Sequence, residues 1–217
     1  MVETDKMITC LEFNKMVNVQ PETIKRYLQG SLILADDIKV GAKNRITYYF
    51  YPETVRQYAA QFGWKVITEE NQKIIFYEFM MNMRMSYSYK PVFFKSLLEM
   101  CDKNGSARMA DIVRYFENYY LERRVNDLFV EKNDSIFSSA NFDSSDVKAL
   151  ILRYPYRRFA YMGLMEYSKL CDTIELDRRL WNSLTKSEKV ELAEICNRKL
   201  QEYYQRFDKL EGQKSGS

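Results

Sequence analysis

Five basic side chains gather within a short stretch near the start of the chain. Lys25 and Arg26 lie in a predicted helix, and Lys39, Lys43 and Arg45 lie in a hairpin predicted to follow it. Lysine and arginine bind phosphate oxygens, and arginine also reads guanine in the major groove. The formal net charge of the 217 residues is only +3, so bulk charge does not predict nucleic-acid binding. Any such activity must come from this local surface.

The chain contains no histidine, which limits the catalytic chemistry open to it. Ser-His-Asp and Cys-His nucleophiles, histidine general bases and HNH-type nuclease sites are excluded. Asp127, Glu131 and Lys132 come closest to a Mg²⁺-dependent nuclease site, but Glu131 and Lys132 are adjacent and would face opposite sides of a strand. The seven glycines are scattered and form no phosphate-binding loop. We therefore expect a protein that is not an enzyme.

The four cysteines, Cys10, Cys101, Cys171 and Cys196, are far apart and form no CxxC pair. Without histidine the usual zinc spacings cannot be built, so we expect reduced thiols, no metal and no cofactor. No apolar run approaches the roughly 18 residues of a membrane span, and no secretory signal is recognised. These observations predict a cytoplasmic protein that does not bind membranes.

Local signals predict a compact set of elements in residues 1–67. Thr9 and Glu12 form a capping box that opens a helix over residues 9–17. Asn18 suits a tight turn, Pro21 suits the first position of a second helix, and Gly30 suits its end. Two β-rich runs then flank a glycine- and asparagine-containing loop, which predicts a hairpin. The predicted strands are residues 38–40 and 46–50, and another proline-opened helix begins at Pro52 and ends near residue 62.

Residues 11–60 resemble the excisionase-type and MerR-type winged helix-turn-helix family, over about a quarter of the chain. The matching pieces are Leu11-Glu12-Phe13, Val19-Gln20-Pro21-Glu22-Thr23-Ile24-Lys25-Arg26-Tyr27, Gly30-Ser31-Leu32 and Tyr51-Pro52-Glu53-Thr54-Val55. The resemblance implies that one helix enters a groove of double-stranded DNA. The sequence departs from the family in the wing, where Lys43-Asn44-Arg45 replaces a denser arginine cluster.

The resemblance also implies which side chains face DNA. Glutamine can pair with adenine and arginine with guanine, while a threonine at a helix start can hold phosphate. Lysines and arginines of the wing would reach the backbone or the minor groove. The implied DNA-binding residues are Gln20, Thr23, Lys25, Arg26, Lys39, Lys43, Asn44 and Arg45.

The rest of the chain is predicted to be helical. We expect a connecting helix in residues 68–86 and a helical domain for oligomerisation or partner binding in residues 87–217. Asp143 and the Thr185 capping box mark two helix starts in this domain. A short hairpin is expected at residues 128–137, so residues 91–137 fit either a second winged-helix-like unit or a plain helical arrangement. The predicted fold class is mainly α with small β-hairpins.

The last helix carries an apolar seam with spacings of three and four residues. It can pack on the domain's own core or pair with a second subunit, and a homodimer suits palindromic DNA sites. The seam residues are Cys196, Leu200, Tyr203 and Phe207.

Arginines elsewhere have two interpretations. In the run at residues 153–159, arginines are interleaved with aromatic residues. Such a run is suited to binding nucleic acid or an acidic partner, but it is also suited to a structural turn whose aromatic side chains fill the core. Arg123 and Arg124 are expected to be solvated at a helix end.

Together these features favour a sequence-specific DNA-binding transcription regulator of prokaryotic or mobile-element origin. The alternative is a two-part protein, such as one from a phage. Its helix-turn-helix would regulate its own promoter, and its C-terminal domain would bind and inhibit a defence protein. Anti-CRISPR proteins with helix-turn-helix domains provide the analogy for this alternative.

Overall fold

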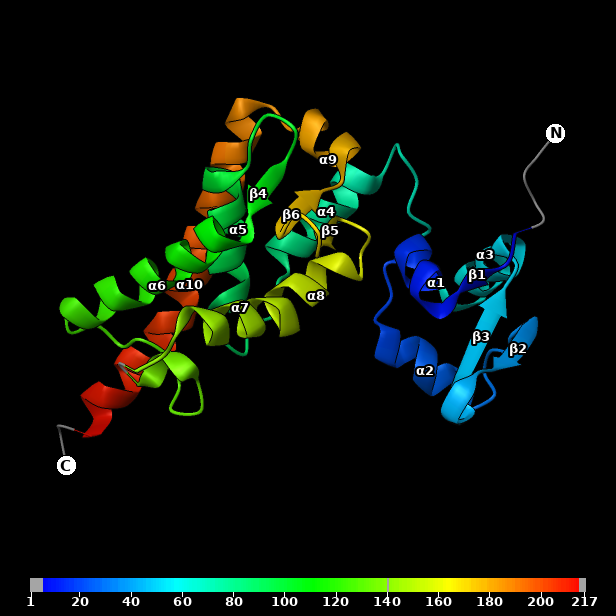
Figure 1. Ribbon diagram of the computed structural model, residues 1–217, viewed down its shortest axis with the longest axis horizontal. Helices are drawn as coiled ribbons and strands as arrows, with labels where there is room; N and C mark the ends of the chain where they lie inside the picture. Colours follow the sequence, from blue (N-terminus) through cyan, green and yellow to red (C-terminus); the bar gives the residue numbers. More distant parts are fainter. Residues whose placement is uncertain (1–5, 140, 215–217) are drawn as a thin grey trace. The chain divides into compact units, whose positions relative to one another are not determined.

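The computed structural model describes residues 6–139 and 141–214 and is mainly helical with two small antiparallel sheets, which confirms the predicted fold class (Figure 1). The chain divides into two compact units. Unit 1 comprises residues 1–75 with 160–163, and unit 2 comprises residues 76–159 with 164–217. Within the described residues, no helix is both long and apolar enough to cross a membrane.

Unit 1 begins with a strand and a pair of helices and continues into a hairpin and a third helix. Its elements are β1 (Ile8–Thr9), α1 (Cys10–Val17), α2 (Pro21–Gln29), β2 (Asp37–Val40), the 3-10 turn η1 (Ala42–Asn44), β3 (Ile46–Phe50) and α3 (Pro52–Phe62). The strands form an antiparallel sheet in the order β1-β3-β2. Ile8 pairs with Phe50, and Val40 pairs with Ile46 beside the hairpin loop. The predicted hairpin is therefore confirmed.

Short-range signals account for the α1–α2 pair. The capping box at Thr9 is present, because the Thr9 side chain accepts a hydrogen bond from the Glu12 N–H and the Glu12 carboxylate accepts one from the Thr9 N–H. Asn18 ends α1 in the left-handed region at φ 47°. The buried Asn14 amide donates to the Val19 carbonyl at 2.6 Å and so fixes the turn. Pro21 then occupies the start of α2, as predicted.

One apolar core holds unit 1 together. Phe13 of α1 meets Phe50 of β3 edge-on, with ring centroids 4.8 Å apart. Ile24 of α2 is fully buried, and Tyr27 and Leu28 pack against the same core. The core thus fixes which face of α2 points inward. The buried members of this cluster are Phe13, Val17, Ile24, Ile33, Phe50, Val55 and Ala59.

Unit 2 is built from helices around a second three-stranded sheet, and α4 (Gln72–Met81) leads into it. Its elements are α5 (Tyr89–Met100), β4 (Ser106–Arg108), α6 (Met109–Val125), the 3-10 turn η2 (Ile136–Ser138), α7 (Ser144–Arg153), α8 (Pro155–Ala160), β5 (Met165–Ser168), β6 (Thr173–Leu176), α9 (Arg178–Ser183) and α10 (Lys186–Lys214). The antiparallel sheet has the order β4-β6-β5. The helix starts predicted at Asp143 and Thr185 are confirmed by their capping hydrogen bonds.

The hairpin expected at residues 128–137 is wrong, because this segment contains no strand and ends in η2. Side chains rather than a β-ladder satisfy its carbonyl groups. Arg123 Nε donates to the Phe129 carbonyl at 2.8 Å, and Arg124 donates to the Phe137 carbonyl at 2.7 Å. The expectation that both arginines are solvated is therefore also wrong, since they anchor the segment after α6.

The seam on α10 belongs to the core of unit 2. Cys196, Leu200 and Tyr203 are buried, and α10 packs along α5. Phe207 is half-buried and stacks on Phe129, with ring centroids 4.2 Å apart. Of the two interpretations of the seam, the structure supports packing on the protein's own core. The pairing of this seam with a second subunit stays a prediction, and three of its four side chains are buried within unit 2.

Candidate nucleic-acid interface

The exposed side of α2 carries the two cations predicted for it. Burial of Ile24, with Tyr27 and Leu28 half-buried, turns the opposite face of the helix to solvent. Lys25 and Arg26 lie on that exposed face. The Arg26 guanidinium lies 5.8 Å from the centre of the Tyr27 ring, so its stem runs along the helix surface.

Gln20 and Thr23 occupy the start of α2 and are half-buried. Gln20 is the N-cap residue, and its carbonyl accepts hydrogen bonds from the N–H groups of Thr23 and Ile24. Its side chain makes no capping hydrogen bond. Both side chains therefore border the exposed face of α2 rather than standing on it.

The hairpin loop displays the remaining predicted residues. Lys43 and Asn44 adopt left-handed φ values of 58° and 55°, and the Gly41 N–H donates to the Arg45 carbonyl at 2.8 Å to close the loop. Asparagine tolerates this conformation better than lysine does. Lys43, Asn44 and Arg45 are all exposed. In the view of Figure 1, α2 and the tip of this hairpin lie at the same lower end of unit 1.

Charges along the hairpin are separated. Lys39 is exposed on β2, with its ammonium 4.9 Å from the centre of the Tyr49 ring. The acidic residues lie at the other end, where Asp36 accepts hydrogen bonds from the Tyr51 N–H at 2.8 Å and the Thr54 hydroxyl at 3.1 Å. Asp36 thus joins the hairpin base to α3, and the tip is left basic.

Sequence reasoning missed an apolar face on the same hairpin. Val40 and Ile46 are cross-strand partners, and both are more than half exposed, at 67% and 53%. Ile38, two residues before Val40, is 54% exposed. The alternation of these residues is visible in the sequence and predicts strands. It does not reveal that this face, which packs on the core at Phe50 and Tyr48, continues past the core towards the hairpin tip. The hairpin therefore presents apolar side chains beside its cations.

The residues considered for metal-dependent catalysis do not form a site. Glu131 is 3% exposed and accepts hydrogen bonds from the Ser88 N–H at 2.8 Å, the Ser88 hydroxyl at 2.6 Å and the Tyr203 hydroxyl. Lys132 instead lies over the Tyr87 ring, 5.0 Å from its centre. Among the described residues, no group of three or more histidine, cysteine, aspartate or glutamate side chains could hold a metal ion.

Burial also makes two cysteines poor nucleophiles. It raises the pKa of Cys101 and of Cys196 to about 12, so both thiols are protonated at neutral pH. Neither is therefore a candidate reactive group.

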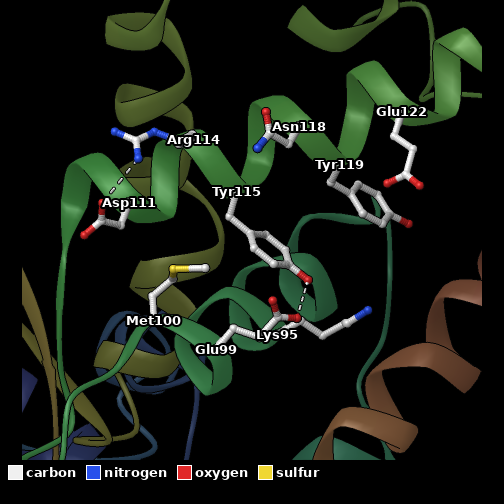
Figure 2. A pocket seen from close by; sticks show the side chains of 9 residues that line it. All are labelled: Lys95, Glu99, Met100, Asp111, Arg114, Tyr115, Asn118, Tyr119 and Glu122. Carbon is white, nitrogen blue, oxygen red and sulfur yellow. Dashed lines mark hydrogen bonds and ion pairs between the residues drawn. The ribbon is translucent and has the colours of Figure 1, made fainter.

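A pocket of about 520 Å³ lies between α5 and α6 of unit 2 (Figure 2). The Tyr115 hydroxyl donates to Glu99 at 3.1 Å, and burial raises the pKa of Tyr115 above its usual value. The pocket is lined by charged residues of both signs: Lys95, Glu99, Asp111, Arg114 and Glu122.

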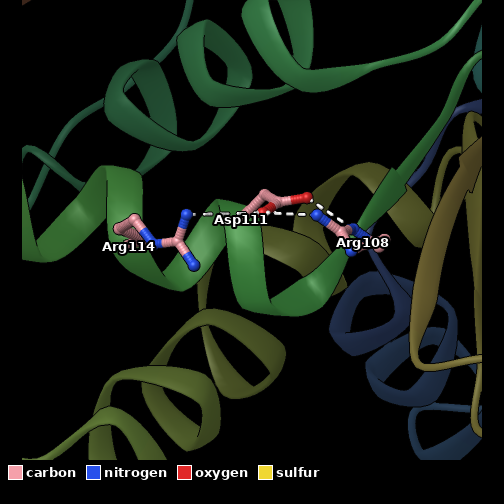
Figure 3. A network of polar contacts seen from close by, with 3 residues as sticks. All are labelled: Arg108, Asp111 and Arg114. Atoms are coloured by element: carbon pink, nitrogen blue, oxygen red, sulfur yellow. Dashed lines mark hydrogen bonds and ion pairs between the residues drawn. The ribbon is translucent and has the colours of Figure 1, made fainter.

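At the start of α6, the Arg108 guanidinium donates two hydrogen bonds of 2.7 and 3.1 Å to the Asp111 carboxylate (Figure 3). The Arg114 guanidinium lies 3.9 Å from the same carboxylate. This network lies at the junction of β4 and α6.

The chain matches no protein-family model, and neither a curated protein nor a solved structure is significantly similar to it. Its function must therefore be argued from its own residues.

Proposed function

We propose that unit 1 is a winged helix-turn-helix module that binds double-stranded DNA, and that the protein is a DNA-binding transcription regulator. The observation that carries the proposal is the joint exposure of cations on two successive elements. Lys25 and Arg26 stand on α2, and Lys43 and Arg45 stand on the hairpin tip. A helix that enters a groove while a hairpin follows the backbone needs this arrangement.

The roles of the residues follow from their chemistry. Arg26 would read a guanine edge or hold a phosphate, and Lys25 would hold a phosphate. Gln20 and Thr23, at the start of α2, would contact an adenine and a phosphate. On the hairpin, Lys39, Lys43, Asn44 and Arg45 would follow the DNA backbone or the minor groove.

The test measures binding of the full chain to duplex DNA by fluorescence anisotropy at several salt concentrations. We expect the double variant Arg26→Ala/Arg45→Ala to bind more weakly. If both side chains hold phosphates, it should also lower the slope of log affinity against log salt by about 1.8, since each phosphate contact contributes about 0.9. Arg56→Ala is the matched control. Arg56 is half-exposed on α3 and pairs with Glu53 at 3.1 Å, so its loss removes a cation outside the proposed surface.

Unchanged affinity and slope in Arg26→Ala/Arg45→Ala would remove α2 and the hairpin as the DNA surface. A loss about half as large in Arg56→Ala, which removes one cation instead of two, would show that only general charge matters. A homodimer on a palindromic site remains part of this proposal. We place its interface outside the α10 seam, because Cys196, Leu200 and Tyr203 are buried within unit 2.

A further inference from the structure

Unit 2 repeats the chain order and the strand order of unit 1. In unit 1, β1 is followed by α1, α2 and the β2–β3 hairpin, and β3 lies between β1 and β2. In unit 2, β4 is followed by α6, α7, the short α8 and the β5–β6 hairpin, and β6 lies between β4 and β5. In both units the first strand therefore pairs with the last strand of the hairpin, and α7 occupies the position of α2.

The correspondence includes how the hairpin is held beside the helix pair. Although residues 126–143 separate α6 from α7, these two helices pack together. Lys148 of α7 forms an ion pair of 2.7 Å with Asp172 in the β5–β6 loop, and the Tyr167 hydroxyl donates to the same carboxylate at 2.6 Å. The hairpin of unit 2 is thus tied directly to the helix that matches α2. The winged-helix-like order expected in residues 91–137 instead spans residues 106–176.

Cations gather where α7 ends and α8 begins. Arg153 and Arg157 are exposed, and the Arg158 guanidinium lies 5.6 Å from the centre of the Phe79 ring. Lys90, at the start of α5, donates a hydrogen bond to the Arg84 carbonyl. Burial and the nearby charge of Arg158 lower the pKa of Lys90 to about 8. The Lys90 ammonium and the Arg158 guanidinium therefore lie close enough for their charges to interact.

Aromatic side chains accompany these cations. Tyr154 is half-exposed, and the Arg153 guanidinium lies 5.3 Å from the centre of its ring.

Acidic groups are also present, since Asp134 and Asp146 line a pocket of about 260 Å³ with Arg153 and Tyr154. Asp146 lies in the first turn of α7. Carboxylates therefore lie beside Arg153 at the edge of the basic surface.

We propose that the surface formed by Lys90, Arg153, Arg157 and Arg158 is a second binding surface for duplex DNA. The choice of DNA rests on the proposed function of unit 1, because the argument transfers the role of α2 to α7 and α8. If both surfaces engage the same duplex, the second contact forms at high effective concentration and the affinity of the chain exceeds that of either unit.

The experiment compares full-length variants by anisotropy with a fluorescent duplex at several salt concentrations. Arg153→Ala/Arg157→Ala is made in the wild-type chain and in the Arg26→Ala/Arg45→Ala chain. The matched control is Arg178→Ala/Arg206→Ala, which removes two exposed arginines from α9 and α10. Arg153→Gln/Arg157→Gln repeats the test with longer polar side chains, and circular dichroism verifies the fold of each variant.

We expect Arg153→Ala/Arg157→Ala to lower the salt slope by about 1.8 in the wild-type chain, while the control keeps the wild-type slope. In the Arg26→Ala/Arg45→Ala chain it should remove most of the remaining binding. A slope equal to that of the control in the folded alanine and glutamine variants would overturn the proposal. If instead only the Arg26 and Arg45 substitutions lack effect, the proposed function of unit 1 fails while the second surface stands.

Discussion

The buried carboxylate of Glu131 is expected to be the main polar anchor of unit 2. It joins the segment after α6 to the start of α5 through Ser88 and to α10 through Tyr203. The Ser88 hydroxyl has another partner, because it lies 2.7 Å from the Tyr120 hydroxyl. Burial and the hydrogen bond to Glu131 raise the pKa of Tyr203, so its hydroxyl remains a donor.

Replacing Glu131 with alanine would leave the Ser88 N–H and the Tyr203 hydroxyl buried without an acceptor. Each such group costs about 1–3 kcal/mol, so we expect Glu131→Ala to lower the free energy of unfolding by about 2–6 kcal/mol. Tyr203→Phe removes one hydroxyl and should cost about 1–2 kcal/mol. The double variant should lose less than the sum, because both changes act on one network.

The assay is urea unfolding in a Trp64→Phe background. Trp181 is then the single tryptophan, and it lies in unit 2, so fluorescence follows that unit alone. The matched control is Glu122→Ala, which removes an exposed carboxylate from α6 and should change stability by less than about 0.5 kcal/mol. A cost for Glu131→Ala no larger than that of Glu122→Ala would refute this account of the network.

Three further predictions concern stability. Gly63→Ala should lower the free energy of unfolding by about 1 kcal/mol, because φ is +66° there and nothing lies within 4 Å of the added methyl group. Gly105→Ala should lower it more, because φ is +81° and the methyl group would lie 2.8 Å from Trp181. Equal losses of stability in urea unfolding would contradict this. Leu200→Glu should unfold unit 2 rather than yield a folded monomer, because Leu200 is buried in the unit's own core, and circular dichroism with light scattering distinguishes these outcomes. Lys90 has a native pKa of about 8, below its unfolded value of about 10.4, so the unfolded state binds more protons between these two pH values. In that pH range the stability of the wild-type protein should rise with pH relative to that of Lys90→Met. Parallel profiles of stability against pH for the two proteins would contradict the lowered pKa.

The helix pair of unit 1 could be predicted because its signals act over a few residues. The Thr9 capping box, the left-handed Asn18 and the proline that opens α2 each operate within one helical turn. The inward stripe that begins at Ile24 then determines that Lys25 and Arg26 are exposed. The half-buried positions of Gln20 and Thr23 depend on tertiary packing, which spacing does not reveal.

The sheet of unit 2 could not be predicted in the same way. β4 has three residues, and its partner β6 lies more than sixty residues later in the chain. Such a short strand shows no alternation, and its pairing depends on long-range contacts. The β5–β6 hairpin did carry a signal, because the apolar Ile174 and Leu176 alternate with the charged Glu175 in the sequence. The arginines in the last turn of α6 were misjudged because carbonyl groups of the following segment accept their hydrogen bonds.

The most direct test of the central claim is selection of bound duplexes from a random DNA pool by the full-length protein. The proposed role of α2 predicts that wild-type protein enriches a recurrent sequence motif. Thr23→Ala/Arg26→Ala should lose that motif, while Arg56→Ala should retain it. Failure of the wild-type protein to enrich any motif, or enrichment of the same motif by Thr23→Ala/Arg26→Ala, would contradict the assignment of unit 1 as a sequence-reading DNA-binding module.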